Sequence, residues 1–343
     1  MIDSYSIACL QANVRYITNP AQKKEVISQN LNRGLELIDS VMRWGGRPKI
    51  VTFPEFFLSG FIGVSAKNID DYLQMSVQIP GDETDVLAKK AVEHGIYIAG
   101  GNYEVDDDWP GRLFLTVFLI SPEGKVIIKN RTLNVTSSTF SIASSPGDFL
   151  SEYIAKYGQD ALFPVVDTPL GKLAVASGDM IWPETVRGLV FKGAEVLLGC
   201  CTGGVRFMFR EIARVRAMEN MAYLSVCGAG RIIGSIVPET WSSGDSTIVD
   251  YNGRVIAKTD SLDEATIVAE IDIDQLRKTR ARSANNILAM IRGDIYGPLY
   301  QNLEAWPTDR WNQKPIQDTS EAKVVIKEVL ERLYRKGTLT RPS

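Results

Sequence analysis

Residues 172–201, KLAVASGDMIWPETVRGLVFKGAEVLLGCC, contain the pattern that decides the fold. The apolar run KLAVA predicts a buried strand, and GDM predicts a turn in which Gly178 takes a positive φ. Pro183 suits the first position of a helix, Gly193 suits its end, and EVLL predicts the next buried strand. Ser177 is therefore expected on a turn between a strand and a helix, where backbone N–H groups point toward developing negative charge.

Composition and charge narrow the class of protein. The chain has 343 residues, of which 45% are hydrophobic and 23% charged, and this balance predicts a globular protein with a sizeable core. The net charge of −3 gives no indication of a nucleic-acid surface. No apolar run is long enough to span a membrane, and the N-terminus, MIDSYSIACLQA, lacks the basic region of a signal peptide. We therefore expect a cytoplasmic protein with neither a membrane nor a nucleic-acid partner.

Histidine and cysteine usage limits the possible site chemistry. The single histidine excludes a zinc site built on several histidines, and the cysteines lack a CxxC spacing, so we expect no metal and no cofactor. Cys9, Cys200, Cys201 and Cys227 are expected to be reduced and mostly buried. His94 lies at the end of a predicted helix, directly before a glycine. We interpret it as a cation at a helix C-terminus and not as a member of a catalytic triad.

Strands and helices alternate first, and later strands pair directly. This order indicates an α/β protein with a mixed sheet or with two sheets packed together. Asn252-Gly253 predicts a hairpin. Periodicity is lost from about 278 to 317, so we expect one domain over 1–280 and a C-terminal extension over 281–343. We expect strands at 5–12, 47–53, 96–101, 113–120, 125–130, 172–176, 195–198, 222–230, 246–258 (as a hairpin) and 266–272, and helices at 21–43, 83–94, 183–193, 206–221 and 319–336.

Six segments between about residues 5 and 280 occur in an order that points to a known family. They are SIACLQAN, IVTFPEFFLSGF, FLISPEGKVIIKNRTL, SGDMIWPETVRGLVFKGAEVLL, IARVRAMENMAYLSVCGAG and GDSTIVDYNGRVIAKTD. In these segments the chain resembles the nitrilase superfamily of carbon–nitrogen hydrolases, especially its aliphatic amidase, formamidase and carbamoylase-like branches. The resemblance implies a four-layer αββα sandwich, pairing of subunits into a homodimer or a higher homo-oligomer, and a small amide-like ligand. It also implies cofactor-free hydrolysis by a Glu–Lys–Cys triad, in which the Glu is a general base, the Cys thiolate attacks carbon and the Lys stabilises the oxyanion.

When the family motifs are matched to this sequence, the resemblance implies that only one of the three triad residues is present. The glutamate of the FPE motif is Glu55. The lysine position holds Thr132, and the cysteine position holds Ser177. A shifted register would bring in Lys129 as the lysine, but Arg131 then loses its match to the family arginine. A second glutamate that amidases carry after the lysine has no match in the loop NVTSSTFSIASSPGD.

These substitutions change what the site can do. A serine hydroxyl is much less acidic than a thiol and normally needs an adjacent base, and Thr132 cannot bring a positive charge to an oxyanion. Ser177 is a ligand contact, a relic of the family turn or an unusual nucleophile. Glu55 is a lone acid or base with a pKa raised by burial, or a carboxylate satisfied by backbone N–H groups or by Arg131. Cys201 is an alternative nucleophile or a buried thiol.

Further residues are candidates for contact with a ligand. They are Arg131, Asp179, Trp182 and Phe140, with Trp241 as a further aromatic residue. Asp179 is also suited to cap the helix that begins near Pro183, and the aromatic side chains are equally suited to packing.

Three functions stay open from the sequence. The first is an enzyme with altered machinery that acts on an amide-like molecule. The second is an inactive homologue that binds a small molecule or serves as a partner subunit. The third is an ordinary amidase or nitrilase, which would require a different assignment of Thr132 and Ser177.

Overall fold

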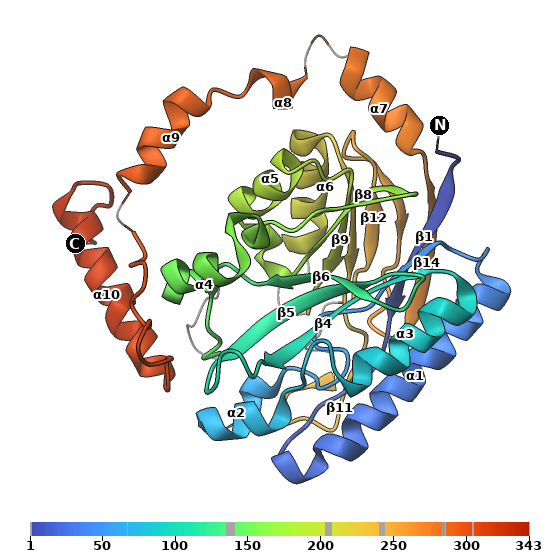
Figure 1. Cartoon of the computed structure of the whole chain (residues 1–343), viewed down its shortest axis with the longest axis horizontal. Coiled ribbons are helices and arrows are strands. Elements are labelled where there is room, and N and C mark those ends of the chain that lie inside the picture. The colour runs from blue at the N-terminus through green and yellow to red at the C-terminus, as the bar shows by residue number, and fades with distance from the viewer. Residues whose placement is uncertain are drawn as a thin grey trace.

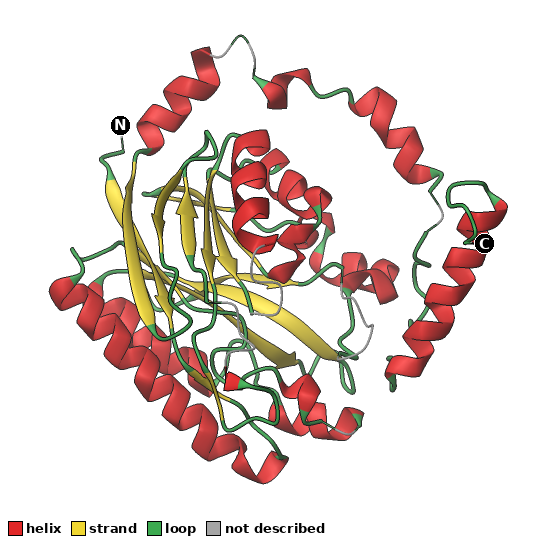
Figure 2. Cartoon of the chain, turned by 180° about the vertical axis from the view of Figure 1, so that it is seen from behind, coloured by secondary structure: helices red, strands yellow, loops and turns green. Residues whose placement is uncertain are grey.

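The computed structural model describes residues 2–66, 68–134, 141–202, 208–239, 244–282, 284, 286–303 and 305–342. Two six-stranded β-sheets form the centre of the molecule, and helices cover their outer faces (Figure 1). Figure 2 shows the same arrangement from behind, with the strands between two groups of helices.

The first sheet has the strand order β14-β1-β3-β4-β5-β6. Strands β1, β3 and β4 pair in parallel, whereas β14, β5 and β6 join antiparallel. The bounds are β1 (Tyr5–Gln11), β3 (Ile50–Thr52), β4 (Tyr97–Val105), β5 (Leu113–Ile120), β6 (Val126–Arg131) and β14 (Ala265–Ile271).

The second sheet has the order β13-β12-β10-β9-β8-β7, with β8, β9 and β10 parallel. The predicted hairpin is confirmed, because β12 and β13 pair antiparallel around Asn252-Gly253. The bounds are β7 (Val166–Thr168), β8 (Gly171–Ala176), β9 (Val196–Cys200), β10 (Tyr223–Cys227), β12 (Thr247–Val249) and β13 (Val255–Lys258). A separate parallel pair joins β2 (Val14–Arg15) to β11 (Ile232–Ile233).

The alternation of side chains along β8 explains the layers. Leu173 and Val175 point into a cluster shared by both sheets, whereas Ala174 and Ala176 pack in the cluster that holds the outer helices of the second sheet. Those helices are α5 (Pro183–Phe191) and α6 (Met208–Asn220), and the first sheet is covered by α1 (Lys23–Trp44) and α3 (Asp82–His94). The predicted four-layer αββα sandwich is confirmed.

The chain continues into a C-terminal segment in which the periodicity is lost from about 278 to 317 and for which we predicted no helix before residue 319. The structure corrects this, since α7 (Ile273–Arg282), α8 (Ile287–Met290) and α9 (Gly293–Gln301) precede α10 (Thr319–Arg335). In Figure 1 these four helices run as an arc around the body. Helix α9 escaped prediction because its nine residues include Pro298 and two glycines, which disfavour a helix. The remaining helices are α2 (Ile69–Met75) and α4 (Leu150–Tyr157).

The turn after β8 differs in one detail from the prediction. Gly178 does not take a positive φ, because it begins a short 3₁₀ helix, Gly178–Ile181, while Gly193 does take one, at 103°. Among the helices of the described residues, none combines the length and the apolar character that a membrane crossing requires.

Candidate active site

Ser177 occupies the predicted turn between β8 and α5. It is the N-cap of the 3₁₀ helix Gly178–Ile181, and its Oγ accepts a hydrogen bond of 3.4 Å from the backbone N–H of Asp179. The side chain is buried. The local sequence therefore places a hydroxyl at the end of β8, where it caps the 3₁₀ helix, and α5 begins six residues later.

Thr132 reaches Ser177 from the opposite sheet. Its Oγ1 lies 2.8 Å from the Ser177 Oγ. Thr132 directly follows β6, and Asn130 of β6 fixes that strand against β8 by donating from Nδ2 to the Val175 carbonyl oxygen at 2.8 Å. The two positions that the motifs assigned to the family lysine and cysteine are thus in direct contact.

Asp179 completes a chain of hydrogen bonds with these two hydroxyls. The Ser177 Oγ donates to Asp179 Oδ1 at 3.0 Å, and the Leu133 N–H donates to Oδ2 at 3.2 Å. Thr185 also bonds to the carboxylate. Burial raises the pKa of Asp179 to about 6, even though these hydrogen bonds favour its charged form.

Glu55 approaches the same turn from the end of β3. The Thr202 hydroxyl donates to Glu55 Oε2 at 3.1 Å, and the Gly178 backbone N–H also bonds to this carboxyl group. Burial raises the pKa of Glu55 to about 8, and the nearby charge of Asp179 adds to the rise. Phe56, the next residue, has a φ of 58°, a conformation that non-glycine residues rarely adopt and that is often found at functional sites.

The cations predicted near this site lie in another cluster. Arg131 donates from Nε and Nη2 to the two oxygens of Glu104, both at 3.0 Å, and it also pairs with Asp106. Lys129 Nζ donates to Glu104 Oε1 at 2.7 Å and to Asp106 Oδ2 at 3.1 Å. The shifted register that would bring in Lys129 is therefore wrong, as is the alternative in which Arg131 satisfies Glu55. The predicted substrate contact of Arg131 finds no support in this geometry. Among the residues that the structure describes, no lysine or arginine forms an ion pair with Glu55.

Cys201 offers no activated thiol. All four cysteines are free and buried, as the sequence predicted. Burial raises the pKa of Cys201 well above its usual value, and the charge of Glu55 raises it further, so this thiol stays protonated. Its predicted role as an alternative nucleophile is thereby weakened.

The aromatic candidates are placed only in part. Trp182 directly follows the 3₁₀ helix as its C-cap and is exposed, at 39%, directly before Pro183. Phe140 and Trp241 fall outside the described residues. The predicted ligand contact of Trp182 stays a prediction.

Thr202 is a site residue that the motifs did not identify. It follows Cys201 at the carboxyl end of β9, next to β8 in a parallel pair. Side chains that follow neighbouring parallel strands meet at the same edge of a sheet, and this position was the available signal.

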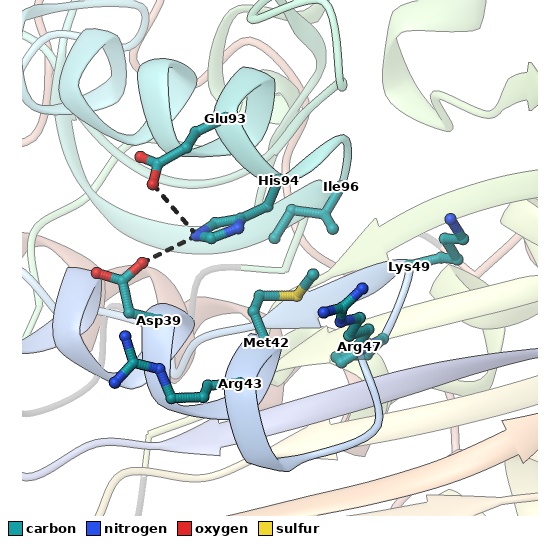
Figure 3. Close-up of a pocket in the computed structure, with 9 residues that line it drawn as sticks. Asp39, Met42, Arg43, Arg47, Lys49, Glu93, His94 and Ile96 are labelled. Atoms are coloured by element: carbon teal, nitrogen blue, oxygen red, sulfur yellow. Dashed lines mark hydrogen bonds and ion pairs between the residues drawn. The ribbon is translucent and has the colours of Figure 1, made fainter.

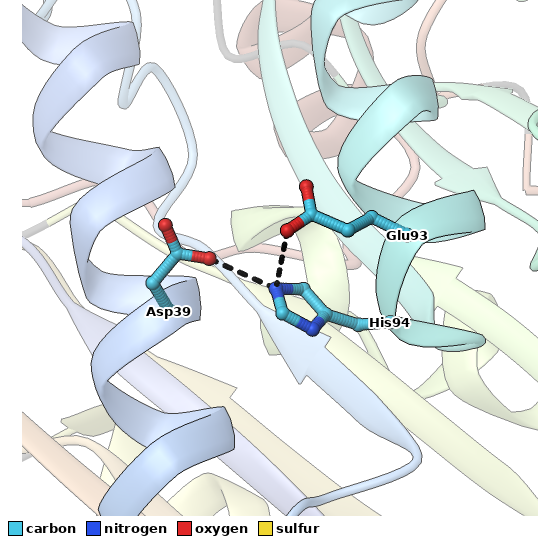
Figure 4. A group of neighbouring side chains, drawn as sticks. All are labelled: Asp39, Glu93 and His94. Carbon is cyan, nitrogen blue, oxygen red and sulfur yellow. Dashed lines mark hydrogen bonds and ion pairs between the residues drawn. The ribbon is translucent and has the colours of Figure 1, made fainter.

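The single histidine belongs to a different cluster, where the last turns of α1 and α3 lie side by side (Figure 4). His94 Nε2 lies 2.8 Å from Asp39 Oδ1 and 3.8 Å from Glu93 Oε1. Figure 3 shows these side chains at a surface pocket, with Arg43 and Arg47 on its other walls. Three such groups within 4.8 Å of one another resemble a metal triad. However, Lys90 pairs with Asp39 at 2.7 Å and with Glu93 at 3.0 Å, so a network of ion pairs explains the cluster.

Comparison with known proteins agrees with this architecture. The family profile described as Carbon-nitrogen hydrolase matches residues 6–281. The omega-amidase NIT2 of Xenopus tropicalis is 29% identical over 289 residues, which cover 82% of this chain and 95% of that protein. Among solved structures, a carbon-nitrogen hydrolase from Helicobacter pylori G27 has a TM-score of 0.66 at 16% identity, covering 87% of this chain and 99% of the other. Saccharomyces cerevisiae Nit3, a member of branch 10 of the nitrilase superfamily, has a TM-score of 0.64 at 21% identity, covering 84% and 97%. The chain belongs to the carbon–nitrogen hydrolase family, the nitrilase superfamily.

Proposed function

We propose that this protein acts on a small amide-like molecule at the site formed by Glu55, Thr132, Ser177 and Asp179, by chemistry that uses no thiolate and no lysine. Membership of an amide-hydrolysing family and a relative named as an omega-amidase support the substrate class. The observation that carries the altered chemistry is Glu55, a buried carboxyl group with a pKa of about 8 that accepts hydrogen bonds from the Thr202 hydroxyl and from the backbone N–H of Gly178, the residue after Ser177.

The protonation state of Glu55 decides its role in the proposed reaction. At pH 7 a carboxyl group with a pKa near 8 is mostly protonated, so it donates a proton more readily than it accepts one. A buried acid of this kind is suited to protonate the departing nitrogen of an amide. Thr132 contributes a neutral hydrogen bond where the family resemblance implies the charge of a lysine.

A second candidate is an inactive homologue that binds a small molecule or serves as a partner subunit. It is favoured by the hydrogen bonds that Thr132, Ser177 and Asp179 form with one another, because these bonds already provide partners for their polar groups. An ordinary thiol-dependent amidase is the weakest proposal, because the turn holds a serine and Cys201 is buried and protonated.

A turnover screen by mass spectrometry tests the proposal. Purified protein is incubated with ω-amides of dicarboxylic acids, aliphatic amides, nitriles and cyclic imides, beside the variants Glu55→Gln and Glu211→Gln, the latter an exposed control. We expect turnover that Glu55→Gln lowers by ~10²–10⁴-fold and Glu211→Gln leaves unchanged. Binding without turnover would favour the inactive homologue, and turnover indifferent to Glu55→Gln would refute the role of this residue.

A further inference from the structure

We propose that Asp179 is the proton acceptor for Ser177, and that the pair acts as a serine–aspartate dyad in which Ser177 is the nucleophile. The inference rests on the proposed function, because it supplies the missing base for the same site. The sequence predicted Asp179 only as a helix cap or a ligand contact.

The direction of the hydrogen bonds supports this assignment. The Ser177 hydroxyl has one proton, and an ionised carboxylate has none to donate. With Asp179 ionised, the 3.0 Å bond must run from Ser177 Oγ to Asp179 Oδ1. Thr132, at 2.8 Å, must then donate its proton to the Ser177 Oγ. Ser177 is thus aligned with an acceptor for its proton and a donor toward the charge that develops on its oxygen.

The carboxylate is fixed in place on its other side. Leu133 N–H donates to Asp179 Oδ2 at 3.2 Å, and Thr185 adds a further bond. Ser177 and Asp179 are 2% and 6% exposed, so water competes little for these contacts. The prediction that Asp179 caps α5 is wrong, because the N-cap of α5 is Trp182 and has no side-chain hydrogen bond; Asp179 Oδ1 instead receives the hydroxyl of Ser177.

The basicity of Asp179 suits the task. An ordinary aspartate, with a pKa near 3.8, is a weak base at neutral pH, whereas burial raises the pKa of this group to about 6. It remains ionised at pH 7 and binds a proton about a hundred times more strongly than an ordinary aspartate. Glu55, the neighbouring acid, has the higher pKa and keeps its proton at that pH.

The proposed steps balance. Ser177 Oγ forms a bond to the amide carbon while its proton passes to Asp179, and the carbonyl oxygen takes the electron pair. When the C–N bond breaks, Glu55 gives its proton to the leaving nitrogen, and an acyl ester remains on Ser177. Water then attacks this ester and passes a proton to the ionised Glu55, and Ser177 recovers its proton from Asp179 as the carboxylic acid leaves.

A fluorophosphonate probe tests the dyad without knowledge of the substrate. Ser177 Oγ would form a bond to phosphorus, fluoride would leave, and the proton would pass to Asp179. We expect mass spectrometry of the wild-type protein to find the adduct on the peptide that contains Ser177. The labelling rate should rise with pH through the pKa of Asp179, about 6.

Substitutions at Asp179 distinguish a role as a base from a purely structural role. Asp179→Asn should lower the labelling rate by ~10²-fold or more, and Asp160→Asn, which replaces an exposed aspartate, should leave it unchanged. In a Ser177→Cys background the same change at Asp179 should cost much less when a cysteine-reactive probe is used, because a thiol ionises with less help. Circular dichroism and thermal unfolding establish that each variant is folded.

The outcomes distinguish this inference from the proposed function. A wild-type protein without label at Ser177 overturns the dyad, as does a folded Asp179→Asn protein that is labelled at the wild-type rate. Amide turnover that survives Ser177→Ala also overturns the dyad, while the proposed function stands. Labelling that depends on Asp179, in a protein without amide turnover, supports the dyad and refutes the proposed substrate class.

Discussion

Glu55 and Asp179 are two buried carboxyl groups in one site, and their protonation states depend on each other. Burial raises both pKa values, to about 8 for Glu55 and about 6 for Asp179, and the charge of Asp179 opposes ionisation of Glu55. Near pH 7 Asp179 carries the charge and Glu55 the proton, so the site holds a base and an acid at once.

The raised pKa of Glu55 predicts a dependence of stability on pH. Between the ordinary value of 4.5 and about 8, the folded protein holds a proton that the unfolded chain has lost. The unfolding free energy should therefore fall as pH rises through this window and level off above it, by at most about 5 kcal/mol. Glu55→Gln removes this contribution, so denaturant unfolding from pH 5 to 9 should show a shallower decline than the wild type. Equal declines would contradict the raised pKa, and exposed Glu152→Gln is the control.

The motifs predicted some of these residues better than others. Glu55, Thr132 and Ser177 came from positions within ordered segments, and the structure brings them together. The contact of Asp179 with the Ser177 hydroxyl was not predictable, because the same letters, S-G-D before a helix, equally describe an ordinary cap. Thr202 was missed because its partner is 147 positions away in the chain.

The side chains of β6 alternate between a cluster of ion pairs and the interface with the second sheet. Lys129 and Arg131 point to the cluster of Glu104 and Asp106, whereas Asn130 reaches across to the second sheet. Arg131 also lies over the Phe114 ring, with 3.8 Å between its guanidinium carbon and the ring centroid. This period of two explains why a register shift to Lys129 fails, since it would move each side chain to the wrong face.

We predict that Arg131→Met destabilises the protein far more than Lys129→Met. Glu104 is fully buried and is bonded at both oxygens by Arg131, so the loss of this partner leaves a poorly compensated charge and should cost about 3–5 kcal/mol. Lys129 is less buried, and Lys129→Met leaves Arg131 paired with Glu104. The decrease in the free energy of unfolding should therefore be smaller for Lys129→Met. Urea unfolding of both variants measures the difference. Equal decreases in stability for the two variants would show that the two-point contact of Arg131 with Glu104 contributes no more than the single charge of Lys129.

The C-terminal segment returns to the body after its arc. Arg112 Nη2 donates to the carbonyl oxygens of Trp311 and Asn312 at 2.8 and 2.7 Å, and the Trp311 N–H donates to the Asp148 carbonyl oxygen. Four buried side chains of this segment belong to the hydrophobic cluster that also contains the inner faces of α1 and α3, namely Trp311, Ile316, Ala322 and Val325. The order of six segments predicted the sandwich, but not this docking, which depends on contacts distant in the chain. The boundary near residue 280 and the homo-oligomer stay predictions.

This docking predicts that the extension and the sandwich unfold as one unit. Trp311→Ala should cost about 3–5 kcal/mol, because it empties a site packed on the main cluster. Truncation after residue 303 should cost at least as much, and full-length protein should show one thermal transition. Trp44→Ala, at a side chain 81% exposed, is the matched control and should change the midpoint little. Calorimetry of the three variants decides the matter. A truncated chain with the wild-type midpoint would mean that residues 304–343 add nothing to the stability of the sandwich, and the hydrophobic cluster would then have to be complete without Trp311.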